Sequence, residues 1–421
     1  MVSQLFGKKI NSPCIILILF CLSIFISIIF ISLITNYKTC AFPATDYKEF
    51  YYPVAKNIYE GKGITLKDGD IYTIVPPGYS IILTCLIWIT DNIDIQIDKV
   101  IISYSILVMA LIAILLLFIS NTIWRNNSAI IPSLLWVTCP FALIFINIPY
   151  SELSFILLFY LAFYIFWRLI MNERFNFWGY FFSGVLFGLS MLIKPVAIGI
   201  VVIMAATTLF FKMNHKIRLA IIGSLLLGNL LAVLPWEILV YSKTKNIIVL
   251  SSCGKQRIIN GLAFGLYDNQ IRGKVPEAVN ILQKKIYAIS SESPWLSPKF
   301  DDSFNEITLL LKNEILSRPM VIANLLYIKA MRSWYATDSG RYEDKTRIIQ
   351  AIYLTLITIS GFFAWRLKGK PRLLLVTIGA ITLYFWSMTI LVLSIVRYML
   401  PTMGLLFLLI PCLFEPTIKK N

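Results

Sequence analysis

The stretch PCIILILFCLSIFISIIFISLITNYKTCAFPATDYKEF, residues 13–50, decides the class of fold. Its first part, residues 13–35, carries no charged side chain and is long enough to cross a bilayer as a helix, which takes about 20 residues. Lys8 and Lys9 precede this run, which is too long for a cleavable signal peptide and therefore predicts an uncleaved signal anchor. Asp46 follows close to the hydrocarbon boundary, where a carboxylate is costly unless it has a function.

The composition extends this interpretation to the whole chain of 421 residues. Hydrophobic residues make up 58% of it and charged residues only 14%, with a mean hydropathy of +0.77. The apolar stretches are continuous and do not alternate, so we predict an all-α polytopic membrane protein and exclude a β-barrel. The net charge of +16 is explained by basic cytoplasmic loops, so we expect a lipid bilayer as partner and no nucleic acid.

The apolar runs predict about ten membrane-spanning helices. They cover residues 13–35, 99–119, 129–147, 151–170, 177–193, 196–211, 218–241, 346–365, 372–393 and 397–414. A further run, Tyr79–Thr90, is too short to cross and is predicted to form an interfacial or re-entrant helix on the outer side.

The basic residues orient this arrangement. With both termini in the cytoplasm, the inner loops hold Lys8, Lys9, Arg125, Arg168, Arg174, Lys212, Lys216, Arg218, Arg366, Lys368, Lys370, Arg372, Lys419 and Lys420. The short outer connections hold only Lys194 and Arg397.

Two large segments then lie outside the membrane. They divide the chain into a transmembrane core, residues 1–241, which includes the outer loop 36–98, an extracytoplasmic region, 242–345, and C-terminal transmembrane helices, 346–421. Within the extracytoplasmic region, Asp302–Tyr335 has a helical pattern. Its apolar residues Ile322, Leu325, Leu326, Ile328 and Met331 are predicted to form a face that lies on the membrane.

Five ionisable residues from distant parts of the sequence fall at one predicted depth, at the outer ends of spans. They are Asp46, Glu152, Lys194, Glu237 and Arg397. Charges at this depth are costly unless they are paired or solvated, so we predict a shared polar cavity at the outer membrane face.

Such a cavity suits chemistry on a sugar linked to a polyprenyl phosphate. Lys194 and Arg397 are the candidate phosphate-binding residues. Asp46 or Glu152 is the candidate catalytic base, which accepts a proton from an acceptor hydroxyl as it attacks the anomeric carbon. The phosphate leaves as a stable anion without a general acid, so a single displacement with inversion is expected.

Other side chains are assigned to substrate contacts. Tyr51, Tyr52 and Tyr79 are predicted to stack on the sugar or prenyl group, and Glu49 to contact substrate. No His or Cys cluster has metal-ligand spacing, although a divalent cation held through water by Asp46, Glu49 and Glu152 stays open. Cys40 and Cys253 lie on the same predicted side and either pair or stay free thiols.

Each of these signals has a structural alternative. Asp46 and Glu152 are also suited to the first turns of helices, where acids complement the helix dipole. Lys194 and Arg397 also fit cations that extend to the membrane interface. The aromatic residues also fit an interfacial belt. Glu237 fits the end of a span better than a site.

The order of several motifs resembles the integral-membrane GT-C glycosyltransferases of the protein-mannosyltransferase and aminoarabinose-transferase type, which are similar to glycosyltransferase family 39. The motifs are Asp46 with Tyr51-Tyr52, Pro76-Pro77-Gly78-Tyr79, Tyr150-Ser151-Glu152, the glycine-rich stretch 184–189 with Lys194-Pro195, Leu234-Pro235-Trp236, and Arg397-Tyr398. The resemblance implies a GT-C-like bundle, with Asp46 as the catalytic base or acceptor-positioning residue. Val75 stands where several relatives have a basic residue.

The sequence therefore predicts a glycosyltransferase that moves a sugar from a polyprenyl-phosphate-linked donor to a cell-envelope acceptor, which is a glycan, lipid or protein. The expected location is the bacterial cytoplasmic membrane, with the active site facing the exterior. The alternatives are a transporter or flippase for lipid-linked sugars and an O-antigen polymerase or ligase. The chain has neither the inverted repeats nor the midplane charges typical of transporters.

Overall fold

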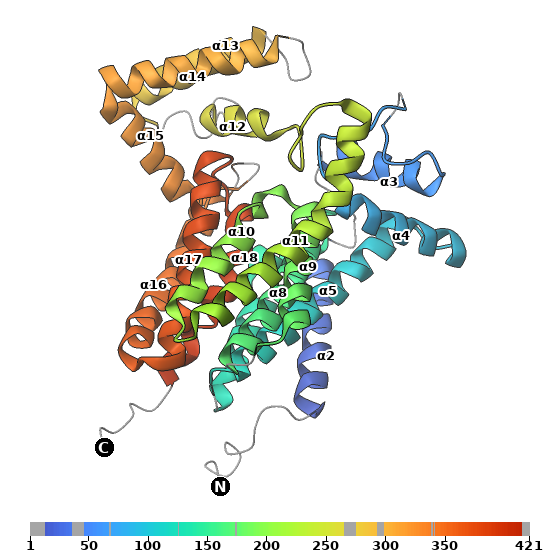
Figure 1. Ribbon diagram of the computed structural model, residues 1–421, viewed down its shortest axis with the longest axis vertical. Helices are drawn as coiled ribbons and strands as arrows, with labels where there is room; N and C mark the ends of the chain where they lie inside the picture. The colour runs from blue at the N-terminus through green and yellow to red at the C-terminus, as the bar shows by residue number, and fades with distance from the viewer. Residues whose placement is uncertain are drawn as a thin grey trace. The chain divides into compact units, whose positions relative to one another are not determined.

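The computed structural model describes residues 13–35, 46–66, 69–124, 126–172, 175–264, 275–292, 299–337, 340 and 342–414, and the described part is almost entirely helical (Figure 1). The α-helices are α2 (Pro13–Phe30), α3 (Tyr52–Tyr59), α4 (Gly78–Ile93), α5 (Ile97–Asn121), α6 (Ile131–Val137), α7 (Pro140–Leu143), α8 (Glu152–Met171), α9 (Phe177–Ile193), α10 (Ile200–Thr207), α11 (His215–Thr244), α12 (Gly254–Leu262), α13 (Glu277–Glu292), α14 (Phe300–Ser317), α15 (Pro319–Arg332), α16 (Glu343–Leu367), α17 (Gly369–Leu391) and α18 (Val396–Phe407).

Short helical segments join or extend these helices. Two of them are π-helical, η1 (Ile31–Thr35) and η2 (Asp46–Tyr51). The others are 3-10 turns, η3 (Asn127–Ile130), η4 (Ile144–Ile146), η5 (Pro195–Ala197), η6 (Thr208–Phe210) and η8 (Ile410–Phe414).

Within the described ranges, seven helices are long and apolar enough to cross a membrane. They are Pro13–Leu33, Ile97–Asn121, Glu152–Met171, His215–Thr244, Glu343–Leu367, Gly369–Leu391 and Val396–Phe414. The chain is an integral membrane protein, and the predicted all-α fold is confirmed.

The prediction of about ten spans is approximate. The predicted span 129–147 is a pair of helices, Asn127–Val137 and Pro140–Ile146, bent by 48° at Thr138-Cys139, and it supplies an eighth crossing only if the pair acts as one span. The predicted spans 177–193 and 196–211 correspond to the shorter apolar helices Phe177–Ile193 and Pro195–Phe210. The run at Tyr79–Thr90 lies in α4, which is likewise a shorter apolar helix.

The chain forms two compact units. The first comprises residues 1–251, 356–381 and 401–421, and the second comprises 252–355 and 382–400. Several helices contribute to both units, because α16, α17 and α18 each cross a boundary between them. The division into three domains predicted from the sequence stays a prediction.

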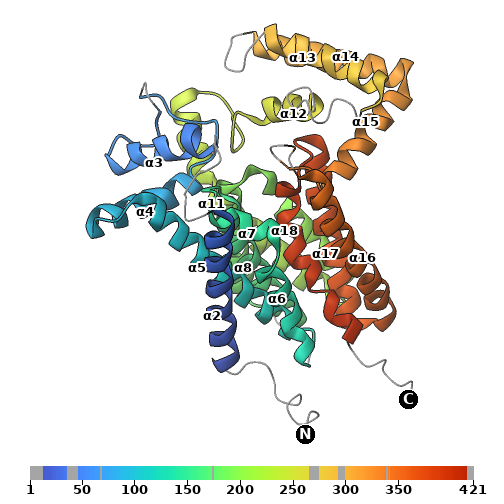
Figure 2. The same cartoon turned by 180° about the vertical axis from the view of Figure 1, so that it is seen from behind.

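The core of the first unit is built around α8. Its side chains Phe155, Phe159, Tyr160, Phe163, Phe166 and Trp167 are all fully buried. α9 packs on α8, where the Ser183 hydroxyl donates to the Ala162 carbonyl at 2.9 Å, and the Tyr160 hydroxyl donates to the Pro401 carbonyl at 2.9 Å. α2 runs along α5 (Figure 2).

The glycine-rich stretch of α9 faces α11, and these two helices lie side by side (Figure 1). A Cβ added at Gly184 would lie 2.1 Å from the Leu225 carbonyl oxygen, and one at Gly228 would lie 2.1 Å from the Phe181 carbonyl oxygen. Small residues of this kind let two membrane helices approach backbone to backbone. The motif therefore has a packing role that is independent of any chemistry.

In the second unit, α12 to α15 surround a hydrophobic core of their own, which includes Ile259, Val279, Leu282, Ile307 and Leu325. This corrects the predicted membrane-facing surface of the Asp302–Tyr335 segment. Leu325 is only 1% exposed, and Ile322 and Ile328 pack against the same core. Leu326 and Met331 are exposed. A helical periodicity identifies an apolar face, but not whether protein or lipid covers it.

Several residues named in the sequence predictions lie outside the described residues. They are Lys8, Lys9, Cys40, Arg125, Arg174, Lys419 and Lys420. Cys253 is buried, and its pairing with Cys40 stays a prediction. The orientation of the chain in the membrane also stays a prediction.

Candidate functional site

The structure joins two of the predicted site residues, Glu152 and Lys194, in a buried ion pair. The Lys194 Nζ donates to the Glu152 Oε1 at 2.5 Å, and the two side chains are 7% and 0% exposed. The residues are 42 positions apart in the sequence. A buried ion pair needs good geometry to offset the loss of hydration, so this contact fixes the ends of two helices relative to each other.

Each charge of this pair lies at the helix end that favours its sign. Glu152 is the first residue of α8, where the helix dipole stabilises an acid. Lys194 follows the last residue of α9 with φ −142° and ψ 107°. Pro195 explains this extended backbone, because a proline disfavours the helical conformation in the residue before it. The Lys-Pro motif thus ends α9 and directs the lysine out of the helix.

The Pro-Pro-Gly-Tyr motif packs against the same end of α9. A Cβ added at Gly78 would lie 2.6 Å from the Leu192 carbonyl oxygen and 2.9 Å from the Ile193 nitrogen. Only glycine permits this approach of α4 to the last turn of α9, next to Lys194. The close contact between the two helices is the reason for the glycine of this motif.

The replacement Gly78→Ala is therefore expected to destabilise the protein by about 1–3 kcal/mol, because backbone atoms cannot move aside as a flexible side chain would. Thermal unfolding of the purified protein in detergent measures this effect. Gly223→Ala is the matched control, since a Cβ at that helical glycine meets no atom within 4 Å. Equal stability of the two variants would contradict the close packing of α4 on α9.

Tyr79 lies near the ion pair and contacts the segment η2. Its side chain is 2% exposed, and its ring lies 5.0 Å from that of Tyr51 in an edge-to-face contact. Burial raises the pKa of the Tyr79 phenol, and interactions with Tyr104 and Glu152 raise that pKa further. Tyr79 is therefore within electrostatic reach of Glu152 and in contact with Tyr51 of η2.

The segment η2 carries both the predicted base, Asp46, and the Tyr51 of this contact. Tyr47 and Tyr51 are buried, whereas Asp46 is half-buried and Glu49 is exposed. The buried tyrosines attach the segment, because the Ser80 hydroxyl of α4 donates to the Tyr51 carbonyl at 3.2 Å. Both acids of η2 are thus more accessible than its two buried tyrosines, as an interaction with an incoming hydroxyl requires.

The three tyrosines predicted to stack on the substrate differ in how exposed their rings are. The rings of Tyr51 and Tyr79 are almost inaccessible and contact each other. Tyr52 is half-buried and lies 5.3 Å from the Tyr47 ring. Tyr51 and Tyr79 therefore hold the loop in place in this structure, and their stacking on a sugar or prenyl group stays a prediction.

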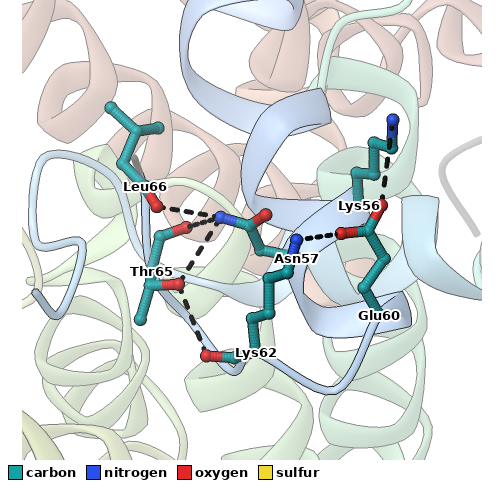
Figure 3. Close-up of polar contacts among 6 residues, drawn as sticks. All are labelled: Lys56, Asn57, Glu60, Lys62, Thr65 and Leu66. Atoms are coloured by element: carbon teal, nitrogen blue, oxygen red, sulfur yellow. Dashed lines mark hydrogen bonds and ion pairs between the residues drawn. The ribbon is translucent and has the colours of Figure 1, made fainter. Parts of the chain in front are cut away.

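A hydrogen-bond network anchors the loop that follows α3 (Figure 3). The Asn57 amide donates to the carbonyls of Thr65 at 2.9 Å and Leu66 at 3.0 Å. The Glu60 carboxylate contacts both Lys62 and Lys56 beside it. One amide thus closes the turn that returns the chain from α3 toward the Pro-Pro-Gly-Tyr motif.

The replacement Asn57→Ala is expected to open this turn locally while the transmembrane core stays folded. It removes two hydrogen bonds to backbone carbonyls, each worth about 0.5–1.5 kcal/mol. Limited trypsin cleavage at Lys62 should become faster. Asn92→Ala is the control, because the Asn92 amide donates to the Trp88 carbonyl within its own helix. Unchanged cleavage in the Asn57 variant would mean that other contacts hold the turn.

Glu237 has a structural partner. Its Oε1 accepts from the Leu250 N–H at 2.8 Å, and the neighbouring Trp236 Nε1 donates to the Leu250 carbonyl at 3.1 Å. Leu250 has a φ of +60°, which is unfavourable for leucine. The Pro-Trp-Glu motif therefore stabilises the chain reversal after α11, in agreement with the interpretation of Glu237 as a residue at the end of a span.

Arg397 belongs to the second unit. It is the second residue of α18, it is 8% exposed, and its guanidinium lies 5.9 Å from the Tyr398 ring. The single cavity shared by all five ionisable residues stays a prediction. A cavity of about 300 Å³ lies at the C-terminal ends of α5 and α8, and none of the predicted site residues lines it.

Among the described residues, no group of three or more His, Cys, Asp or Glu side chains is placed to hold a metal ion. Asp46, Glu49 and Glu152 therefore do not form a three-acid cluster here, and a divalent ion held through water stays a prediction. The sequence interpretation missed Tyr104, whose hydroxyl lies 2.9 Å from the Ser154 hydroxyl near Tyr79. A polar side chain within an apolar span was the available signal.

Comparisons with known proteins identify relatives by structure alone. No protein-family model matches this chain, and no curated protein matches it. The Archaeoglobus fulgidus oligosaccharyltransferase in its apo form is similar with a TM-score of 0.60 and 10% identity, over 96% of this chain and 50% of that chain. The same enzyme in complex with an inhibitory peptide and a dolichol-phosphate has a TM-score of 0.58 and 10% identity, over 94% and 50%.

A third structure of that enzyme, tethered to an acceptor peptide with an NVT sequon, has a TM-score of 0.57 and 10% identity, over 96% of this chain and 50% of that chain. The chain thus spans about half the length of these neighbours. Oligosaccharyltransferases of this type have the GT-C fold. Since nearly all of this chain superposes at such low identity, the likeness is one of fold, and the fold of this protein is GT-C.

Proposed function

We propose that this protein is a membrane glycosyltransferase that moves a sugar from a polyprenyl-phosphate-linked donor to a cell-envelope acceptor on the extracytoplasmic face. The GT-C fold supports glycosyl transfer in general. The observation that carries the proposal is the buried ion pair of Glu152 and Lys194, together with Tyr79, which lies within electrostatic reach of Glu152 and contacts Tyr51 of the segment that carries Asp46. Buried charges are costly in a membrane protein and by default mark a functional site.

The roles of the two acids follow from their surroundings. Glu152 is fully buried and is already neutralised by Lys194 at 2.5 Å, so it is poorly placed to take a proton from an acceptor. Asp46 is half-buried, at the start of η2, and is the better candidate base. We therefore assign proton acceptance to Asp46 and assign Glu152 to holding Lys194 in position.

In the proposed reaction, an acceptor hydroxyl attacks the anomeric carbon while Asp46 takes its proton. The bond between that carbon and the phosphate oxygen breaks, and its electron pair leaves with the polyprenyl phosphate. Lys194 and Arg397 are the proposed cations for the phosphate. One displacement inverts the anomeric configuration.

The structural neighbours favour a second candidate, the transfer of a larger lipid-linked glycan to a peptide. One of them was solved with a dolichol-phosphate and an inhibitory peptide, and another was tethered to an acceptor peptide. Here the lipid carrier and the acceptor site would be similar, but the donor would carry an oligosaccharide.

Turnover by the purified protein tests both candidates. A panel of short-chain prenyl-phosphate monosaccharides is compared with a lipid-linked oligosaccharide, with envelope glycan, lipid and peptide acceptors. The proposal expects release of prenyl phosphate, with a product of opposite anomeric configuration. Turnover of the oligosaccharide donor alone would support the second candidate. Transport of an intact donor across vesicles without release of phosphate would overturn both.

A further inference from the structure

The second unit contains a buried lysine, Lys329 of α15, that joins two distant segments of the chain. Its side chain is 1% exposed. The Nζ donates to the Gly261 carbonyl at 2.5 Å, at the end of α12, and to the Val392 carbonyl at 3.1 Å, just after α17. Lys329 is 68 residues from the first partner and 63 from the second. Three elements of this unit are thus tied together at one ammonium group.

A buried ammonium held by carbonyls is costly, since burial disfavours its charged form. Burial lowers the pKa of Lys329 to about 7. In the part of the chain that the structure describes, it makes no ion pair. The nearby charges are Arg332 and Glu343, which pair with each other through two hydrogen bonds of 3.0 and 2.9 Å. The two hydrogen bonds to backbone carbonyls are contacts that an apolar side chain in this position could not make.

The contact at Lys329 requires a glycine at position 261, because the two backbone segments approach closely there. A Cβ at Gly261 would lie 1.3 Å from the Val392 carbonyl oxygen, so only glycine lets the two segments meet at Lys329. The Phe264 ring closes the site, with the Lys329 Nζ at 5.9 Å and the Arg332 guanidinium at 5.2 Å from its centroid. The contact is therefore supported by backbone, aromatic and charged neighbours together.

The segment that Lys329 holds leads directly to Arg397. Val392 lies between α17 and α18, and the Val396 N–H donates to the Ala336 carbonyl at 2.9 Å. Both Lys329 and Ala336 belong to the stretch formed by α15 and the residues after it. This stretch therefore holds the connection between α17 and α18 by hydrogen bonds to Val392 and to Val396, which directly precedes Arg397.

We propose that Lys329 is a positioning residue that sets the location of Arg397 through the Val392–Val396 segment. The proposal rests on the function proposed above, in which Arg397 binds the donor phosphate. It does not place Lys329 in contact with the donor. The backbone from Val392 to Val396 transmits a displacement to Arg397, because hydrogen bonds to Lys329 and Ala336 hold both of its ends.

Steady-state kinetics with a short-chain prenyl-phosphate sugar provides the first test. Lys329→Met is expected to lower kcat/KM for the donor by about 10–100-fold, because small displacements of a contact residue are costly, while the acceptor KM stays unchanged. Lys329→Arg keeps a donor group for the carbonyls and should restore part of the loss. Lys312→Met, at an exposed lysine of α14, should behave as the wild type.

The combination with Arg397→Ala distinguishes positioning from a general structural effect. If Lys329 acts through Arg397, Lys329→Met has no further effect on kcat/KM once Arg397 is removed. Two losses that multiply would overturn the proposal, as would equal losses for donor and acceptor.

A readout without catalysis separates this proposal from the proposed function. In an Arg397→Cys variant, the rate of labelling by a water-soluble maleimide is compared with and without Lys329→Met. A change of several fold is expected, and an unchanged rate would overturn the positioning role. Absence of turnover with every donor, accompanied by altered labelling, would overturn the proposed function and leave the positioning geometry supported.

Discussion

Replacement of Asp46 with asparagine is expected to reduce turnover by about 10²–10⁴-fold without loss of folding, because a positioned general base contributes a factor of this size. Asparagine keeps the shape of the side chain and a hydrogen-bonding group in the first turn of η2, but it cannot accept the acceptor's proton. The half-buried position of Asp46 allows the replacement without opening a cavity. Initial rates of prenyl phosphate release measure the effect.

The matched control is Asp70→Asn, an exposed carboxylate in the same outer segment. It should have near wild-type activity, and thermal unfolding should be similar for both variants. Wild-type turnover by the Asp46 variant would remove this residue from the mechanism. Loss of activity in both variants would instead indicate that the negative charge of the segment matters, and not one base.

Breaking the buried ion pair is expected to have the largest effect on stability. Lys194→Met leaves the Glu152 carboxylate buried without its cation, and Glu152→Gln leaves a buried ammonium. Removal of one partner of a buried pair costs about 3–5 kcal/mol. The double variant Glu152→Gln/Lys194→Met has no uncompensated charge and should recover much of the loss. Thermal unfolding in detergent of the three variants and the wild type forms a double-mutant cycle.

The coupling between the two positions is the informative quantity. Additive losses would mean that the two residues do not depend on each other, contrary to the 2.5 Å contact. Activity separates stability from function. We expect the double variant to be well folded but poorly active, because it lacks the Lys194 cation. Full activity in it would remove Lys194 from the proposed phosphate contacts.

Part of the site could be predicted from the sequence, because the preferences of nearby residues determine where a helix begins and ends. The end of the apolar run at residue 193 predicted that Lys194 lies at the end of a span, and the structure has it directly after α9, where Pro195 also disfavours a helical backbone. The prediction that Glu152 opens a helix is also confirmed. Both follow from backbone conformation within a few residues, so no knowledge of other helices was needed.

Other features could not be predicted from the sequence, because they depend on contacts between distant segments of the chain. The face of α15 was assigned to the membrane, but Leu325 lies in a protein core, because periodicity does not report what covers a face. Lys329 carried no visible signal, since its partners are carbonyls of residues more than 60 positions away. The aromatic residues Tyr51 and Tyr79 were predicted as ligand platforms, whereas their mutual contact depends on how α4 packs.

The sequence by itself determined that this chain is an all-α membrane protein, because the hydrophobic effect and backbone hydrogen bonding within a bilayer leave few alternatives to apolar helices. It also placed acids and bases at helix ends. Only the tertiary structure decided that Glu152 meets Lys194, that Gly78 admits α4 to the end of α9, and that Lys329 joins α12 to the segment before Arg397. These contacts depend on which helix ends come together, and that is fixed by the packing of the whole chain.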